Sequence, residues 1–250
     1  MNIERITIRA FSATQDQESC ARFSHEHSRV LKDIGVHNVV KPAKDWAENK
    51  DTTVFVAEHA ELGMIGGFRL QLDTPERPLP MEHALIQIDP RISQSLALLR
   101  SEGNAEMTAL WTAHRFSGRG LPLLLMSSLV AAASQLPIKH LSILASQYMA
   151  PYAIRLGCWH LTGVGNDGVF NYPIDGLRSS AMSIPDLQLL SGASEKDRRR
   201  VFGLRLRPQQ VRMELPRLVP LEVCYELLLE PSSMLAHYRS LELVHQRYAA

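Results

Sequence analysis

The chain has 250 residues, with 27 Lys and Arg against 26 Asp and Glu, so its formal net charge is +1. A near-neutral chain has no overall attraction to a polyphosphate backbone, so its composition does not favour nucleic acid as a partner. Hydrophobic residues make up 45% of the sequence, which is enough for a sizeable core and argues against global disorder. The length allows one large domain, or one domain with an appendage.

Three further patterns limit the class of protein. The longest weakly charged stretch, residues 121–137, contains four polar side chains and falls short of the roughly 18 apolar residues that a membrane-spanning helix needs. The first residues alternate charged and apolar side chains where a signal peptide would carry an apolar run. Cys20, Cys158 and Cys224 are far apart, which opposes a disulfide framework and a cysteine zinc site. We therefore expect a soluble cytoplasmic protein without a metal site.

The first third of the chain alternates strand and helix patterns. Ile3, Ile6 and Ile8 lie among polar residues, and the alternation of residues 5–9 predicts a strand near the start of the chain. One apolar face at helical spacing predicts a helix over residues 16–34. Residues 52–58 and 64–72 are rich in β-branched and other apolar side chains, and the glycine between them favours a hairpin.

An insert and a second alternating region follow. Residues 73–104 are broken by prolines, with a helix expected at 92–100, and an insert this long is often functional. After it, strands are predicted at 105–113 and 140–145, helices at 120–135 and 149–156, and extended segments up to residue 184. Strand–helix alternation of this kind predicts a mixed α/β fold, with a central twisted sheet flanked by helices.

The character of the sequence changes after residue 184. Residues 195–217 are rich in arginine, and helices are predicted at 221–229 and 233–248. The arginines suit a solvated helix face. Alternatively, they could bind the acidic surface of a carrier protein or the phosphates of a nucleotide. The sequence thus predicts a domain over residues 1–184 and a mostly helical extension, packed on it, over residues 185–250.

One hexapeptide carries the chemical signal. Residues 115–120 read Arg-Phe-Ser-Gly-Arg-Gly and lie between a predicted strand and the best predicted helix. Glycines let backbone N–H groups approach a ligand, and a helix N-terminus leaves N–H donors unpaired, so this arrangement can cradle a pyrophosphate. A simple strand-to-helix turn is the alternative. The spacing matches neither the dinucleotide-binding fingerprint nor the P-loop.

This hexapeptide resembles the acyl-donor motif Q/R-x-x-G-x-G/A of the GNAT (Gcn5-related N-acetyltransferase) superfamily. The resemblance covers residues 3–184 by element order, and includes residues 151–159, whose Leu-Gly step is similar to one in a later helix of the family. It implies direct transfer of an acyl group from a thioester to an amine, without metal, with the donor lying where the fourth and fifth strands part. The donor-binding residues that it implies are Trp111, Thr112, Ala113, Arg115, Phe116, Ser117, Gly118, Arg119 and Gly120.

The resemblance also implies the acid and base. Glu106, at the head of the fourth strand, is the first candidate for the base that takes the ammonium proton, although it can also be read as a solvated edge carboxylate; His114 is the second. The family's usual tyrosine acid falls at Ala153 in this chain. Tyr148 and Tyr152 are the replacements that the sequence offers, and simple packing is the alternative for both.

The length of the insert is similar to that in the N-acyl amino acid synthase and autoinducer synthase branch of the superfamily. The resemblance implies an N-acyltransferase that takes its acyl group from acyl carrier protein or acyl-CoA and gives it to a primary amine of an amino acid or small metabolite. Two alternatives stay open: an acetyl-CoA-dependent N-acetyltransferase of small molecules or proteins, and a non-catalytic fold that binds an acyl thioester or a partner. Arg69 and Arg100 are further candidates for gripping a substrate carboxylate. The acyl chain length, the acceptor and the oligomeric state are not determined by the sequence.

Overall fold

The computed structural model describes residues 3–33, 35 and 45–229. Its strands form one mixed ten-stranded sheet in the order β6-β8-β5-β4-β3-β2-β1-β10-β9, with β7 paired to β8. The strands are β1 (Glu4–Ser12), β2 (Thr52–His59), β3 (Gly63–Leu72), β4 (Asn104–Thr112), β5 (His140–Ser146), β6 (Trp159–His160), β7 (Val169–Asn171), β8 (Arg178–Ile184), β9 (Gln209–Glu214) and β10 (Leu221–Glu226).

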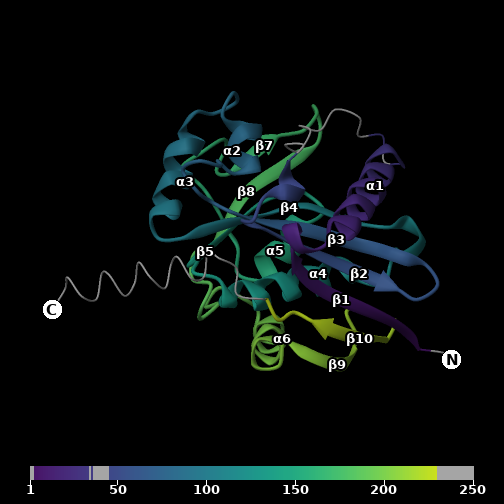
Figure 1. The fold of residues 1–250 in the computed structure, drawn as a ribbon. Coiled ribbons are helices and arrows are strands. Elements are labelled where there is room, and N and C mark those ends of the chain that lie inside the picture. The colour runs from purple at the N-terminus through teal and green to yellow at the C-terminus, as the bar shows by residue number, and fades with distance from the viewer. Residues whose placement is uncertain (1–2, 34, 36–44, 230–250) are drawn as a thin grey trace.

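Helices cover both faces of this sheet (Figure 1). The helices are α1 (Gln17–Asp33), α2 (Pro80–Leu85), α3 (Arg91–Ser101), α4 (Leu121–Ala132), α5 (Ala150–Arg155) and α6 (Glu195–Leu206), with short 3-10 turns η1 (Ala13–Gln15), η2 (Trp46–Glu48), η3 (His114–Phe116) and η4 (Ala133–Gln135). Helices α1, α2 and α3 lie on one face, which we call the α1 face, and α4 and α5 lie on the other, the α4 face. The mixed α/β sheet flanked by helices is thereby confirmed.

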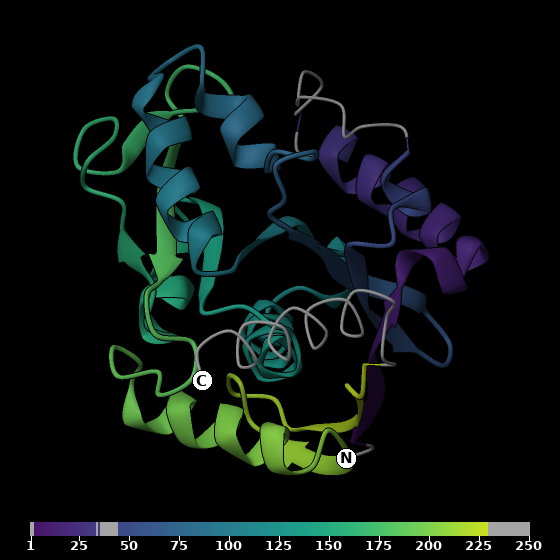
Figure 2. The same cartoon turned by 60° about the vertical axis from the view of Figure 1, so that its left-hand side comes forward.

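Helix α4 is the most buried helix of the structure's described part, with every residue from Leu123 to Ala132 shielded from solvent. Its sequence is apolar all round rather than on one stripe, which is the pattern of a helix enclosed on every side. Figure 2 shows it nearly end-on at the centre of the molecule, with α6 lying outside it. Leu121, Leu124 and Leu125 belong to the main core cluster, together with Phe55 and Phe68 from the sheet.

The chain after residue 184 differs from the prediction. Residues Leu221–Glu226 form strand β10, which runs parallel to β1, whereas a helix was predicted over 221–229. Leu221, Val223 and Tyr225 are buried while the residues between them face outward, so the segment has the two-residue period of a strand. Between residues 185 and 229, the described part of the extension, the regular elements are the helix α6 and the strands β9 and β10, which continue the sheet. The boundary at residue 184 stays a prediction, and the helix predicted at 233–248 lies outside the described residues.

The remaining sequence-based elements are close to those observed. Helix α2, in the insert, is not predicted by the sequence, because prolines interrupt the interior of a helix. Pro80 instead occupies the first helical position, where its missing N–H is tolerated. In the described ranges no helix is long and apolar enough to cross a membrane.

Candidate active site

Strands β4 and β5 run side by side only at their beginnings. They pair in parallel from Asn104 opposite His140 to Met107 opposite Ile143, and both strands then continue without pairing to each other. A break in register between β3 and β4 accompanies the parting: Ala109 has a φ of 54°, and the pairing shifts between Gly67 and Arg69. Beyond Met107, the edges of β4 and β5 that face each other are therefore not joined by ladder pairing.

The hexapeptide of the sequence motif, residues 115–120, lies between the end of β4 at Thr112 and the start of α4 at Leu121. We call it the donor loop. Gly118 and Gly120 both adopt the left-handed backbone conformation, with φ of 78° and 76°, which glycine adopts without strain. Within the described residues, the backbone N–H groups of Gly118, Arg119 and Gly120 donate to no protein atom. Free N–H groups at the start of a helix are donors of the kind that bind phosphate oxygens.

The side chains of the donor loop are mostly engaged elsewhere. Arg115 donates to the backbone oxygen atoms of Leu62 and Met64, at 3.1 and 2.7 Å, and pairs with Glu26 of α1. Arg119 pairs with Glu4 of β1 and lies 4.7 Å above the ring of Phe116, which is itself buried. Both guanidinium groups fasten the loop to the sheet, so any phosphate contact from this loop rests first on its backbone.

The other residues expected to bind the donor lie at the end of β4 and in the donor loop. Trp111 and Ala113 are buried on the α1 face, while Thr112 is half-buried and Ser117 is exposed. The N–H of Ala113 donates to Ile65 at 2.8 Å, which ties the end of β4 to β3. The structure therefore brings the motif residues together at the open end of β4, and their role in donor binding stays a prediction.

Glu106 is not a solvated edge carboxylate. It is 2% exposed on the α1 face of β4, and its carboxylate accepts a 2.8 Å hydrogen bond from the backbone N–H of Met81 at the start of α2. Burial raises the pKa of Glu106 to about 8, and the nearby carboxylate of Asp73 adds to the effect, while the Met81 bond and the Arg69 charge oppose it. A carboxylate with a pKa this close to neutrality is suited to accept a proton from an ammonium group.

A network of polar side chains supports Glu106 from the side of the insert. Asp73, at the end of β3, accepts hydrogen bonds from Arg100 at 2.6 Å and from Asn104 at 3.1 Å. Arg100 also pairs with Glu82, which follows Met81 in α2. Burial raises the pKa of Asp73 even with these bonds in place. Arg100 is therefore committed to two carboxylates of the protein and holds α2 and α3 in position against β4.

The tyrosines predicted as acids lie in different surroundings. Tyr148 is 71% exposed in the turn after β5, and Tyr152 of α5 packs against the main core cluster. A third tyrosine, Tyr172, was not predicted from the sequence. It follows β7 and is half-buried. Burial raises its pKa, and the negative charge of Glu106 adds to the effect. Tyr172 packs against the apolar cluster that contains Met81, the residue whose N–H binds Glu106. Tyr172 lies in a loop 66 residues after Glu106, so no local sequence pattern indicates that the two residues are close.

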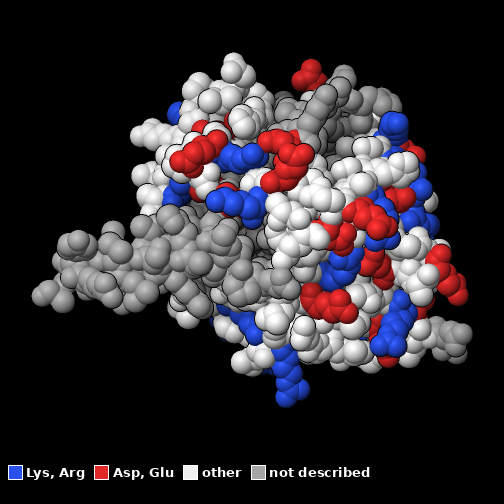
Figure 3. All heavy atoms as spheres, in the orientation of Figure 1, with Lys and Arg blue, Asp and Glu red and all other residues white. Residues whose placement is uncertain are grey.

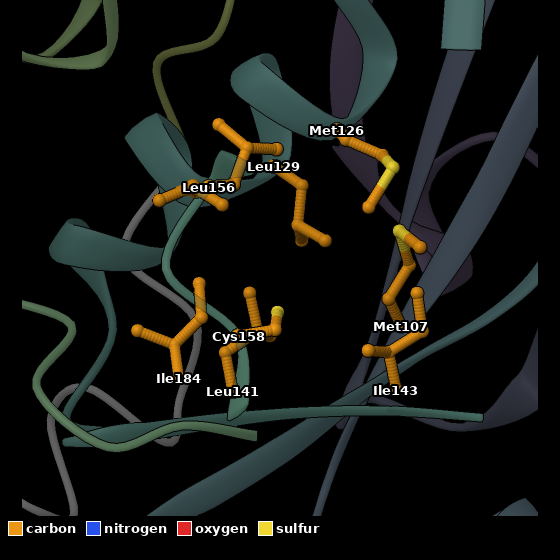
Figure 4. Close-up of a pocket in the computed structure, with 9 residues that line it drawn as sticks. Met107, Met126, Leu129, Leu141, Ile143, Leu156, Cys158 and Ile184 are labelled. Carbon is orange, nitrogen blue, oxygen red and sulfur yellow. The ribbon is translucent and has the colours of Figure 1, made fainter. Parts of the chain in front are cut away.

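A small cavity lies on the opposite, α4 face of the sheet (Figure 4). Its lining is entirely apolar and comes from both parting strands and from α4, with the ends of Met107 and Met126 pointing toward each other. The lining residues are Met107, Met126, Leu129, Val130, Leu141, Ile143, Leu156, Cys158 and Ile184. The volume of the cavity is about 10 Å³, which is close to the smallest volume that can hold one water molecule.

The arginines of residues 195–217 are largely used within the protein. Arg200 is buried and pairs with Asp197 and Glu214, while Arg205 donates to backbone oxygen atoms that include Leu187. On the face drawn in Figure 3, acidic and basic residues are interspersed and form no continuous patch of one sign. In the described part of the chain, no group of three or more His, Cys, Asp or Glu residues is arranged to hold a metal ion.

The sequence matches no family model and no curated protein. The structure, in contrast, resembles acyl-transferring synthases. FeeM, an N-acyl amino acid synthase from uncultured soil microbes, superposes with a TM-score of 0.55 at 15% identity, over 72% of this chain and 92% of FeeM. BjaI, a CoA-dependent acyl-homoserine lactone synthase with SAM and isopentyl-CoA, gives 0.54 at 15% identity, over 85% and 95% of the two chains. The AHL synthase LasI gives 0.53 at 14% identity, over 80% and 96%. At this level of identity the likeness establishes the fold alone, and it confirms the GNAT-like fold that the motif and element order predicted.

Proposed function

We propose that this protein is an N-acyltransferase that moves an acyl group from a thioester, acyl-CoA or acyl carrier protein, to a primary amine of a small metabolite or amino acid. The observation that carries the proposal is the parting of β4 and β5 between Glu106 on one face and an apolar cavity on the other. A thioester between the strands would direct its acyl chain into the cavity. Its carbonyl carbon would then meet an amine arriving from the Glu106 side.

The reaction follows from these positions. The amine nitrogen attacks the thioester carbonyl carbon, the C–S bond breaks, and the electron pair leaves with sulfur as a thiolate. Glu106 takes the proton that the nitrogen must lose, and its raised pKa keeps this transfer close to balanced near neutral pH. The thiolate then takes a proton from a nearby acid, for which Tyr172, Tyr148 and Tyr152 are the candidates.

Donor binding in this proposal rests on the backbone of the donor loop. The free N–H groups of Gly118, Arg119 and Gly120 suit a pyrophosphate or a phosphopantetheine phosphate. Arg115 and Arg119 contribute by holding the loop in shape, since each already has a carboxylate partner.

The size of the cavity bears on the acyl group. A volume of about 10 Å³ has no room for a long chain in this arrangement of side chains, which favours a short acyl group and supports acetyl-CoA-dependent transfer as the second candidate. Two of the lining residues, Met107 and Met126, are unbranched and have three rotatable side-chain bonds each. A longer acyl chain would enter the cavity only if these two methionine side chains moved.

Incubation with acyl-CoA and acyl carrier protein donors of two to twelve carbons, against a panel of amines, tests the proposal. We expect donor-dependent release of free thiol and an acylated amine by mass spectrometry. Glu106→Gln should abolish most of the turnover, whereas Glu102→Gln, which changes an exposed carboxylate just before β4, serves as the matched control. Donor binding by calorimetry without turnover for any amine would instead establish a non-catalytic thioester-binding protein.

A further inference from the structure

Strand β9 is the last strand on its side of the sheet in the described part of the chain, and it pairs with β10 alone. Figure 1 shows it at the rim of the molecule. An edge strand presents a row of unpaired N–H and C=O groups, to which another strand can pair. Lysine, proline or a bulge commonly protects such an edge. The six residues of β9, Gln-Gln-Val-Arg-Met-Glu, include neither lysine nor proline, and their register with β10 has no shift.

The alternation of the β9–β10 ladder indicates which backbone groups of β9 are free. The N–H of Leu227 donates to the carbonyl oxygen of Pro208 at 2.9 Å. Hydrogen-bonded pairs in an antiparallel ladder recur at every second residue, so the backbone groups of residues 210, 212 and 214 face β10. The backbone groups of Val211 and Met213 point outward, and no residue that the structure describes bonds to them.

The side chains of β9 form an apolar row and a polar row. Val211 and Met213 are 52% and 55% exposed, and Leu215, which follows the strand, is 57% exposed. Apolar side chains that gather on a surface in this way mark an interaction site. On the opposite face Arg212 and Glu214 lie 3.5 Å apart. One guanidinium nitrogen of Arg212, Nη1, is buried and has no hydrogen-bond partner among the described residues.

The sequence of β9 is complementary to itself when two copies run antiparallel. If Met213 lies opposite Met213 of a second copy, Arg212 faces Glu214 on both sides of the two-fold axis, and Val211 faces Leu215. The residues with outward backbone groups then meet as hydrogen-bonded pairs, as the alternation requires. A slide of two residues in either direction would set Arg212 opposite Arg212, or Glu214 opposite Glu214. Like charges directly opposite each other destabilise a strand pair, so charge favours the first register over both neighbours.

We propose that β9 pairs with β9 of a second copy of this chain, about a two-fold axis at Met213, and that the protein forms a homodimer with one continuous sheet. The pairing satisfies the outward backbone groups and removes the apolar row from water. It also gives each Arg212 a second carboxylate neighbour. A single pair of short strands is a small interface, so we expect a dissociation constant of about 1–100 μM, within the weak class.

Sedimentation of the full chain tests the dimer, across about 1–300 μM, a range that covers the expected dissociation constant. We expect the average mass to rise with concentration from 28.1 kDa toward twice that value. Met213→Lys places two ammonium groups opposite each other and should keep the protein monomeric throughout. Leu98→Lys makes the same change at a residue that is 67% exposed on α3, and it should leave the mass curve unchanged.

Cysteine variants test the register, in a Cys224→Ser background because Cys20 and Cys158 are buried and Cys224 is not. Opposite residues of a hydrogen-bonded pair are about 5.5 Å apart at Cα, which is within the range of a disulfide. Met213→Cys should therefore form a disulfide-linked dimer under mild oxidation.

Two further variants make the register test specific. Val211→Cys and Leu215→Cys should each remain unlinked alone, whereas an equal mixture of the two should link, because each of these residues faces the other across the axis. Leu98→Cys, on α3, measures the linking that random collision produces. All of these positions are exposed, so the substitutions leave the core intact.

A mass of 28.1 kDa at every concentration would overturn the proposal. A dimer that Met213→Lys leaves intact would place the interface elsewhere, and stronger linking by Val211→Cys alone than by Met213→Cys would contradict the register. Hydrogen exchange distinguishes a second copy from other occupants of the edge. The amides of Val211 and Met213 should become protected only as concentration rises, and protection at all concentrations would assign the edge to another part of the same chain.

Discussion

The backbone N–H of Met81 donates a hydrogen bond of 2.8 Å to the carboxylate of Glu106, and this bond joins the insert to the candidate base. Glu106 is on β4, while Met81 is the second residue of the short helix α2 within the proline-containing insert of residues 73–104. The insert therefore covers the carboxylate and contributes to its burial, which is the main cause of its raised pKa. The acid–base properties of Glu106 therefore depend on the insert, through its cover, the Met81 N–H and the carboxylate of Asp73.

The first prediction concerns the pH dependence of acyl transfer. We expect kcat/KM to rise with pH through a midpoint near 8, because Glu106 must lose its proton before it can accept one from the amine. Glu106→Gln should lower kcat by about 100-fold or more and remove this part of the profile. Initial rates from pH 6 to 10 measure it, with two acceptors of different amine pKa to separate the acceptor's own titration. A midpoint near 8 that persists in Glu106→Gln would assign it to another group.

The second prediction concerns stability. The pKa of Glu106 is raised in the folded state from a model value of 4.5 to about 8, so the folded state holds this proton more tightly. The stabilisation is fully present below pH 4.5 and is lost as pH rises through 8. The glutamine in Glu106→Gln cannot titrate. We therefore expect the free energy of unfolding of the variant, relative to that of the wild type, to increase as the pH rises from 5 to 9. Urea unfolding at each pH checks this, and a constant difference between the two proteins contradicts it.

The third prediction concerns the donor loop. Gly118 has a φ of 78° and nothing within 4 Å of the place that a Cβ would occupy, so Gly118→Ala obstructs the open space beside the free N–H groups. Gly176, between β7 and β8, has a φ of 86° and equally open surroundings, so Gly176→Ala carries the same backbone strain away from the loop. We expect a similar loss of stability, about 1–2 kcal/mol, in both variants. Only Gly118→Ala should raise the KM for the donor, and equal donor kinetics would remove the cradle assignment.

The fourth prediction concerns acyl chain length. Met126→Ala enlarges the apolar cavity, and Cys158→Phe fills it from the opposite wall. We expect the donor with the highest kcat/KM to become longer in the first variant and shorter in the second. Leu123→Ala is the matched control, since Leu123 is buried in α4 but does not line the cavity, and both alanine variants should lose about 2–5 kcal/mol. A chain-length profile that all three variants leave unchanged would place the acyl group elsewhere.

The fifth prediction concerns the arginine-rich segment. Asp197 is fully buried and pairs with both Arg155 and Arg200, so removal of its carboxylate leaves Arg200 buried with less compensation. Asp197→Ala should lower the free energy of unfolding by about 3–5 kcal/mol. Arg199→Ala breaks an exposed pair in the same helix and should change it by less than about 1 kcal/mol. The reverse ranking in denaturant unfolding would contradict a structural role for this segment.

Local pattern accounts for most of the secondary structure. The isoleucine alternation of β1, the hairpin of β2 and β3, and the apolar helix after the glycine motif are each encoded within about 20 residues, so they can be recognised without the rest of the chain. The error at Leu221–Glu226 has a specific cause. Leucine and glutamate favour helices in isolation, but pairing with β1, more than 200 residues earlier, decides the outcome. The alternation of Leu221, Val223 and Tyr225 was the signal that could have revealed the strand.

The sequence by itself determined the donor-loop motif, most of the elements up to residue 156 and the identity of Glu106 as a carboxylate worth testing. It could not determine that Glu106 is buried, because its cover comes from α2 and its charged neighbour Asp73 from the end of β3. It could not show that Arg115 and Arg119 form ion pairs within the protein, because their partners, Glu26 and Glu4, are about 90 residues or more away in the sequence. Burial and pairing are properties of segments distant in the chain, and they exist only once the sheet has brought those segments together.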